Sequence, residues 1–117
     1  MSGNSQIAFA LLGNTVVIPA DAVAPAGIQA PVYDKFDQQN VGQYRLINAG
    51  TTTVFLGTGP NATDATANAV APIAGTPSAA IVLVPGAVEI LRFNQNTFFS
   101  GLSSAAATVY IVPGQGI

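Results

Sequence analysis

Cysteine, histidine and tryptophan are absent from this sequence of 117 residues, and the absences exclude several kinds of chemistry. Without cysteine the chain can form neither a disulfide nor a thiolate site, so a hydrophobic core has to stabilise the fold. Without histidine it lacks the commonest general base and metal ligand. Asp34 and Asp37 are the only close pair of carboxylates, and Lys35 between them favours a solvated charge cluster over acid–base or calcium chemistry. We therefore expect no enzymatic activity, no cofactor and no metal.

Charge is also scarce, because only three basic and five acidic residues are present. They make up 7% of the chain, against about 25% in ordinary soluble domains. Three cations cannot neutralise a nucleic-acid backbone, and a net charge of −2 gives no attraction to an anionic membrane. Nucleic-acid and membrane partners are therefore not expected. A neutral surface suits packing against copies of the same chain or a larger assembly, with a low-charge monomer as the alternative.

Long hydrophobic runs and a secretory signal are missing as well. The longest apolar runs, such as residues 79–85, are far shorter than the ~20 residues that a membrane helix needs. No Lys or Arg precedes Lys35, and Gly13 and Asn14 interrupt the apolar stretch near the start, so we expect no signal peptide. The lack of cysteine fits a reducing compartment such as a cytoplasm, in which the chain would be made.

Hydrophobic alternation predicts short strands nearly throughout the chain. Turn residues separate them: Gly13-Asn14 is a tight-turn pair, and residues 48–50 predict a hairpin between the strands on either side. We expect a long loop with at most one helical turn at residues 19–42 and a low-complexity segment, an exposed loop or a weak strand, at 58–78. No segment shows the period of a regular helix. The predicted fold is an all-β single domain over residues 1–117, a β-sandwich of jelly-roll or Greek-key type, or a small barrel. Its seven to eight short strands lie at 6–12, 15–18, 43–48, 51–56, 80–84, 87–93, 97–102 and 108–112.

The period of two residues assigns several side chains to faces. Val109 and Ile111 share a face that we place in the core. Phe98 and Phe99 project to opposite faces, so one ring belongs to the core. The other is either part of a second packing layer or a contact residue, and as the contact residue we choose Phe99. In the strand at 87–93 one face carries Val88, Ile90 and Arg92, and the other carries Glu89, Leu91 and Phe93.

A partner interface is predicted in the long loop, where aromatic and charged residues gather. Tyr33 and Phe36 stand among charged side chains, which is the composition of an anchor with a polar rim. The alternative is that the two rings fold back and cap one end of the sandwich. The complete set of predicted interface residues is Tyr33, Asp34, Lys35, Phe36, Asp37, Arg92 and Phe99.

Three segments of the second half carry a recognisable pattern. They are NAGTTTVFLG at residues 48–57, VPGAVEIL at 84–91 and VYIVPGQG at 109–116. Over residues 43–116 the chain resembles the jelly-roll cement proteins that decorate the capsids of tailed bacteriophages, whereas residues 1–42 match no pattern of this kind. The resemblance implies a place on the outer capsid surface of the virion, self-association into dimers or trimers, binding to the major capsid protein, and no catalytic residue.

These features together lead us to expect a structural virion protein that decorates or cements a phage capsid. One alternative is another phage β module, from a head fibre or a tail fibre. A second is a carbohydrate-binding β-sandwich. That class usually displays a row of exposed aromatic rings, for which a chain with three Tyr and no Trp offers little support.

Overall fold

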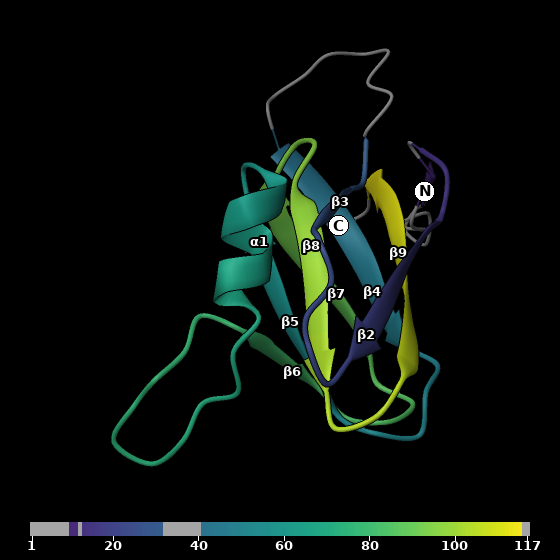
Figure 1. Ribbon diagram of the computed structural model, residues 1–117. Coiled ribbons are helices and arrows are strands. Elements are labelled where there is room, and N and C mark those ends of the chain that lie inside the picture. The colour runs from purple at the N-terminus through teal and green to yellow at the C-terminus, as the bar shows by residue number, and fades with distance from the viewer. Residues whose placement is uncertain (1–9, 12, 32–40, 116–117) are drawn as a thin grey trace.

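One sheet contains all the strands found in residues 10–11, 13–31 and 41–115, which are the residues that the computed structural model describes. The strand order is β6-β5-β8-β2-β9-β4-β7, with β1 beside β9 and β3 beside β8, and the sheet curls into a near-barrel (Figure 1). This confirms the all-β class. The elements are β1 (Ala10–Leu11), β2 (Val16–Asp21), β3 (Ile28–Gln29), β4 (Val41–Asn48), β5 (Val54–Gly59), α1 (Ala62–Asn68), β6 (Ile81–Leu83), β7 (Val88–Asn94), β8 (Phe98–Ser103) and β9 (Ala107–Gln115).

The sheet has two halves that β2 connects. β4, β7 and β9 form one antiparallel half, and β5, β6 and β8 form the other. β2 lies antiparallel to β9 and pairs in parallel with β8 through Ala20 and Asp21. The two halves therefore face each other across one core instead of forming two separate sheets.

Two prolines that directly follow the predicted strands at 15–18 and 108–112 lie inside strands of the structure. Pro19 pairs with Thr108 in the middle of the β2–β9 ladder, and Pro113 pairs with Tyr44 of β4. Pairing of β2 with β8 begins only at Ala20, so Pro19 has a strand neighbour on one side only. Along β9, pairing with β2 ends at Ile111 and pairing with β1 starts at Gly114. Pro113 lies between these two ladders, so it too has a strand neighbour on one side only. A residue without an N–H is tolerated in a ladder at such positions.

The prediction of a loop at residues 19–42 is wrong at 19–21, 28–29 and 41–42, which are strands, whereas 22–27 and 30–31 have no regular structure. β2 continues to Asp21, and Ile28 and Gln29 form β3 against Phe99 and Phe98 of β8. β3 is the strand that raises the count of described strands to nine. At the other end of the segment β4 already begins at Val41.

Both predicted tight connections are also corrected. β4 does not pair with β5, because its neighbours are β7 and β9, while those of β5 are β6 and β8. β1 and β2 lie one after the other along the same side of β9 and do not form a hairpin. Residues 6–9 and 12 of the first predicted strand lie outside the described residues.

Asn48, at the end of β4, explains why the chain turns into the other half of the sheet. Its buried side-chain amide donates to the carbonyl oxygens of Thr52 at 3.0 Å and Leu83 at 2.8 Å. Its side-chain oxygen accepts from the Gly50 N–H at 2.9 Å. Its backbone binds Gly86 and Ala87, both at 3.0 Å, in the connection between β6 and β7. One residue therefore ties together the two edges of the sheet at this end.

A helix occupies part of the predicted loop at residues 58–78, which is a further correction. The Asn61 side chain caps α1 by accepting from the Asp64 N–H at 2.8 Å, a local signal of helix initiation that the low-complexity composition obscured. Gly57 and Gly59 of β5 leave the space in which the helix packs. A Cβ at Gly57 would lie 2.3 Å from the Ala65 carbonyl oxygen. β5 itself runs to Gly59, beyond the predicted end of its strand.

The core confirms the faces predicted from alternation. Tyr44 and Leu46 of β4 and Val109 and Ile111 of β9 are fully buried, while Tyr110 between the last two is exposed. Leu91 and Phe93 of β7 pack against this core from one side of their strand. The rings of Tyr44, Phe93 and Phe99 contact one another, with centroids 5.2 to 5.9 Å apart.

Candidate functional site

The outer face of β2, β9, β4 and β7 carries apolar side chains that are exposed to solvent. Residues paired directly across strands project to the same side of a sheet. The registers of the three ladders therefore align four apolar side chains in one row: Val17, Tyr110, Ile47 and Val88. Val17 and Val88 each expose half of their surface, so no described segment covers them.

A second row follows two residues along the strands and adds positive charge. Arg45 of β4 pairs with Val112 on one side and Ile90 on the other. Arg92 follows Ile90 on the same face of β7. We call the two rows together with Arg92 the uncovered face. It consists of Val17, Ile47, Val88, Ile90, Tyr110, Val112, Arg45 and Arg92.

The outer side of the other half is covered only in part. Val82 of β6, which pairs with Phe55 of β5, still exposes 49% of its surface. α1 packs on β5 and β8 (Figure 1). The segment before β3 is bound to α1 and β8 through the Pro25 carbonyl oxygen. This oxygen accepts from the Thr66 hydroxyl of α1 at 2.9 Å and from the Ser100 hydroxyl of β8 at 2.6 Å. The chain thus covers part of one outer side of its sheet with α1, whereas no described segment covers Val17 and Val88 on the other.

The charge of the uncovered face has one sign. Arg45 and Arg92 are both exposed and are two of the three basic residues in the chain. No acidic side chain belongs to either row, and Glu89 projects to the opposite side of β7. Arginine can lay its apolar stem along such a surface and keep its charge at the margin. The arrangement suits adhesion to a surface that is apolar at its centre and acidic at its edge.

The residues predicted as a partner interface have different outcomes. Arg92 lies on the uncovered face, as described above. Phe99 is completely buried among Tyr44 and Phe93, so the choice of Phe99 as a contact residue is wrong. Its neighbour Phe98 is the half-exposed ring of the pair, because strand alternation turns Phe99 inward. The loop residues Tyr33, Asp34, Lys35, Phe36 and Asp37 lie outside the described residues.

Most of the uncovered face was missed by reasoning from sequence, although a signal was present. Residues 16–18 and 109–112 are apolar at every position, on both faces of their strands. Such runs are typical of strands buried on both sides. Here one side is buried in the core and the other is in solvent, which indicates a surface that another molecule can cover.

The described residues show no arrangement suited to a metal ion or a membrane span. No group of three or more His, Cys, Asp or Glu side chains that could hold a metal is found in residues 10–11, 13–31 and 41–115. Within the same residues, no helix has the length and apolar character needed to cross a membrane.

Comparison with known proteins identifies no relative. No protein-family model, no curated protein and no solved structure gives a significant match to this chain.

Proposed function

We propose that this chain is a non-enzymatic structural protein that decorates or cements the outer surface of a phage capsid and binds the major capsid protein through its uncovered face. The observation that carries the proposal is the contrast between the two halves of the sheet. In one half α1 packs over β5 and β8, whereas in the other half no described segment covers the apolar row at Val17 and Val88. Contiguous exposed apolar surface on a folded domain is typical of a protein-binding site. The scarcity of charge and the resemblance of residues 43–116 support the same role.

The composition of the uncovered face fits a contact that excludes water. Tyr110 lies between Val17 and Ile47 in the first row, with paired neighbours on both sides. Tyrosine and arginine are the residue types that most often contribute strongly at protein interfaces. Arg45 and Arg92 then favour a partner that places carboxylates at the edge of the contact.

Charge also argues against two copies packing through this same face. A twofold contact would bring the arginines of both copies to one interface, and no acidic residue of either row would balance them. The dimers or trimers that the resemblance implies would therefore use another surface. Many copies, each held on the capsid by a modest contact, would act together in stabilising the shell.

A matched pair of variants tests this proposal. Val88→Glu places a charge on the uncovered face, and Val82→Glu places the same charge on β6, at the opposite edge of the sheet. The two valines have nearly equal exposure, 50% and 49%. We expect both variants to melt like the wild type, since surface substitutions change stability by only about 0.5 kcal/mol.

The readout is co-sedimentation with capsids assembled from the major capsid protein encoded in the same genome. We expect the wild type and Val82→Glu to co-sediment and Val88→Glu to remain in the supernatant. Equal binding by Val88→Glu and Val82→Glu would show that the uncovered face is not the contact. Failure of the wild type to bind would contradict the decorating role itself.

A further inference from the structure

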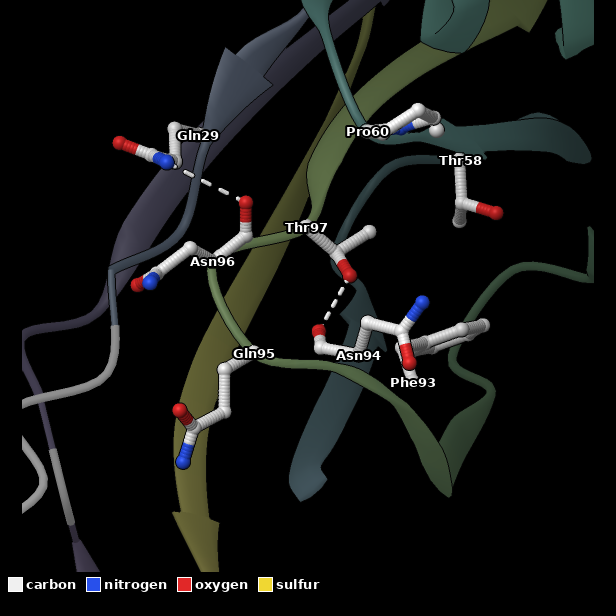
Figure 2. A pocket seen from close by; sticks show the side chains of 9 residues that line it. Gln29, Thr58, Pro60, Phe93, Asn94, Gln95, Asn96 and Thr97 are labelled. Carbon is white, nitrogen blue, oxygen red and sulfur yellow. Dashed lines mark hydrogen bonds between the residues drawn. The ribbon is translucent and has the colours of Figure 1, made fainter. Parts of the chain in front are cut away.

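A hollow lies where the near-barrel stays open, between the ends of β5 and β7. β6 pairs only with Val54–Leu56 of β5, so it ends before the last residues of that strand. On the other side of the opening β7 continues to Asn94. The space between them measures about 380 Å³ and shares no residue with the uncovered face (Figure 2). Its size falls in the range of small-molecule sites.

The inner wall of the hollow is an aromatic ring held firmly in place. Phe93 lines the hollow and is only half-buried. Behind it lie Tyr44, at a ring-centroid distance of 5.9 Å, and Phe99, at 5.6 Å. Both of these rings are fully buried. Phe93 therefore presents a rigid apolar surface to a ligand in the hollow.

The turn that forms one rim of the hollow is fixed from within the core. The buried Tyr44 hydroxyl accepts from the backbone N–H groups of Asn96 at 3.0 Å and Thr97 at 3.4 Å. The Thr97 hydroxyl donates to the Asn94 carbonyl oxygen, and the Gln29 amide donates to the Asn96 carbonyl oxygen at 3.2 Å. Asn96 holds a left-handed backbone with φ of 62°. A rim fixed in advance loses little entropy when a ligand binds.

Two neutral polar side chains remain for a ligand. The Asn94 amide extends into the space toward Thr58 and Pro60, while the side chains of Gln95 and Asn96 point away from it (Figure 2). The structure shows no hydrogen bond from the Asn94 amide or the Thr58 hydroxyl to any described side chain or backbone group. None of the described residues that line the hollow is charged.

We propose that this hollow binds a neutral saccharide unit, with its C–H face on the Phe93 ring and its hydroxyl groups on the Asn94 amide and the Thr58 hydroxyl. An amide both donates and accepts, which matches the two capacities of a sugar hydroxyl. A charged ligand would find no counter-charge among the described lining residues. A purely apolar ligand would leave Asn94 and Thr58 desolvated without partners. The site is independent of the proposed capsid contact.

Amide NMR titration of the full chain tests this inference. The probes are glucose, galactose, mannose and N-acetylglucosamine, with glucuronate as a charged comparison and an unrelated extended peptide as a macromolecular one. A ligand of this size on a shallow site binds in the millimolar range. We expect at least one neutral sugar to shift the amide signals of Thr58, Gly59 and residues 93–97 in a saturable way, and glucuronate to bind more weakly.

Asn94→Ala and Asn14→Ala form the variant and its control, since both asparagines are exposed and only Asn94 lines the hollow. Asn94→Ala should weaken binding roughly tenfold, the effect of losing one or two hydrogen bonds, and Asn14→Ala should leave it unchanged. Absence of saturable shifts with all four neutral sugars would overturn the inference. So would shifts that the peptide alone produces, or binding that Asn94→Ala leaves intact. None of these outcomes depends on capsid binding by the uncovered face.

Discussion

At the scale of single residues, Asn48 makes the connection between the two halves of the sheet. Its amide and backbone bind groups at Thr52, Leu83 and Gly86, all in segments that β4 does not pair with along its length. A short polar side chain in the core is stable here because its donors and acceptor all have partners. No apolar residue of similar size could satisfy the same carbonyl groups.

We predict that Asn48→Ala lowers the free energy of unfolding by about 3 kcal/mol, because it leaves buried carbonyl oxygens and the Gly50 N–H without partners. Urea denaturation of wild type and variant measures the change. Asn14→Ala, at an exposed turn position, is the control and should cost less than about 0.5 kcal/mol. Similar small losses in both variants would show that water replaces the Asn48 amide.

Tyr44 is the second residue whose polar group acts inside the core. Its hydroxyl donates to the Ala30 carbonyl oxygen at 3.2 Å and accepts from Asn96 and Thr97. Burial raises the pKa of this hydroxyl above its ordinary value of 10.0, and the hydrogen bonds from Thr97 and Asn96 offset only part of that effect. The folded protein therefore keeps this proton at a pH at which the unfolded chain loses it.

The sign of the pH effect follows from that difference. Stability from the neutral hydroxyl is complete below about pH 10 and declines as the pH rises toward the folded pKa. We predict that the wild type loses up to about 1.4 kcal/mol per pH unit more than Tyr44→Phe in this alkaline range. Urea denaturation at pH 8 and at pH 10 to 11 measures both proteins. Parallel pH profiles would show that Tyr44 ionises equally well in the folded state.

At the scale of elements, β9 shows how strictly a strand separates its two faces. Ile111 is fully buried, and Tyr110 next to it exposes 38% of its surface on the uncovered face. The two positions therefore make a natural comparison within a single strand.

We predict that Ile111→Asp yields insoluble or unfolded protein, because an unpaired carboxylate in the core costs several kcal/mol, comparable to the stability of a whole domain. Tyr110→Asp should fold and change the free energy of unfolding by about 1 kcal/mol. Circular dichroism of the soluble fractions, followed by thermal melting, distinguishes the two. A folded Ile111→Asp protein would contradict the assignment of the faces.

The faces of strands could be predicted from sequence because they depend on local alternation. Val109, Ile111, Leu91 and Phe93 all follow that rule. The neighbours of each strand could not be predicted, since β4 and β5 look like a hairpin until the buried bonds of Asn48 are known. Likewise the helix at Ala62–Asn68 depends on tertiary space at Gly57 as much as on its capping residue.

At the scale of the whole molecule, the candidate binding surface depends on which strand faces other segments of the chain leave exposed. The charged loop around Tyr33 was a reasonable sequence prediction because it concentrates aromatic and charged residues. The uncovered face has no comparable motif, because its residues come from four strands that are separate in the chain. Only the register brings Val17, Tyr110 and Val88 into one row, and α1 packs on the other half of the sheet.

The position of β9 in the chain has a consequence for how the protein is made. β9 pairs with β1, β2 and β4, yet it follows every other described strand. At translation rates of about 5–20 residues per second, β2 waits for seconds on the ribosome before its partner is synthesised. During that time the apolar residues of β2 and β4 cannot be buried against β9. Chaperones or non-native contacts have to shield them from water. A chain that ends before residue 107 lacks β9, the strand with which β1, β2 and β4 pair. We expect such a chain to be recognised as unfolded and degraded.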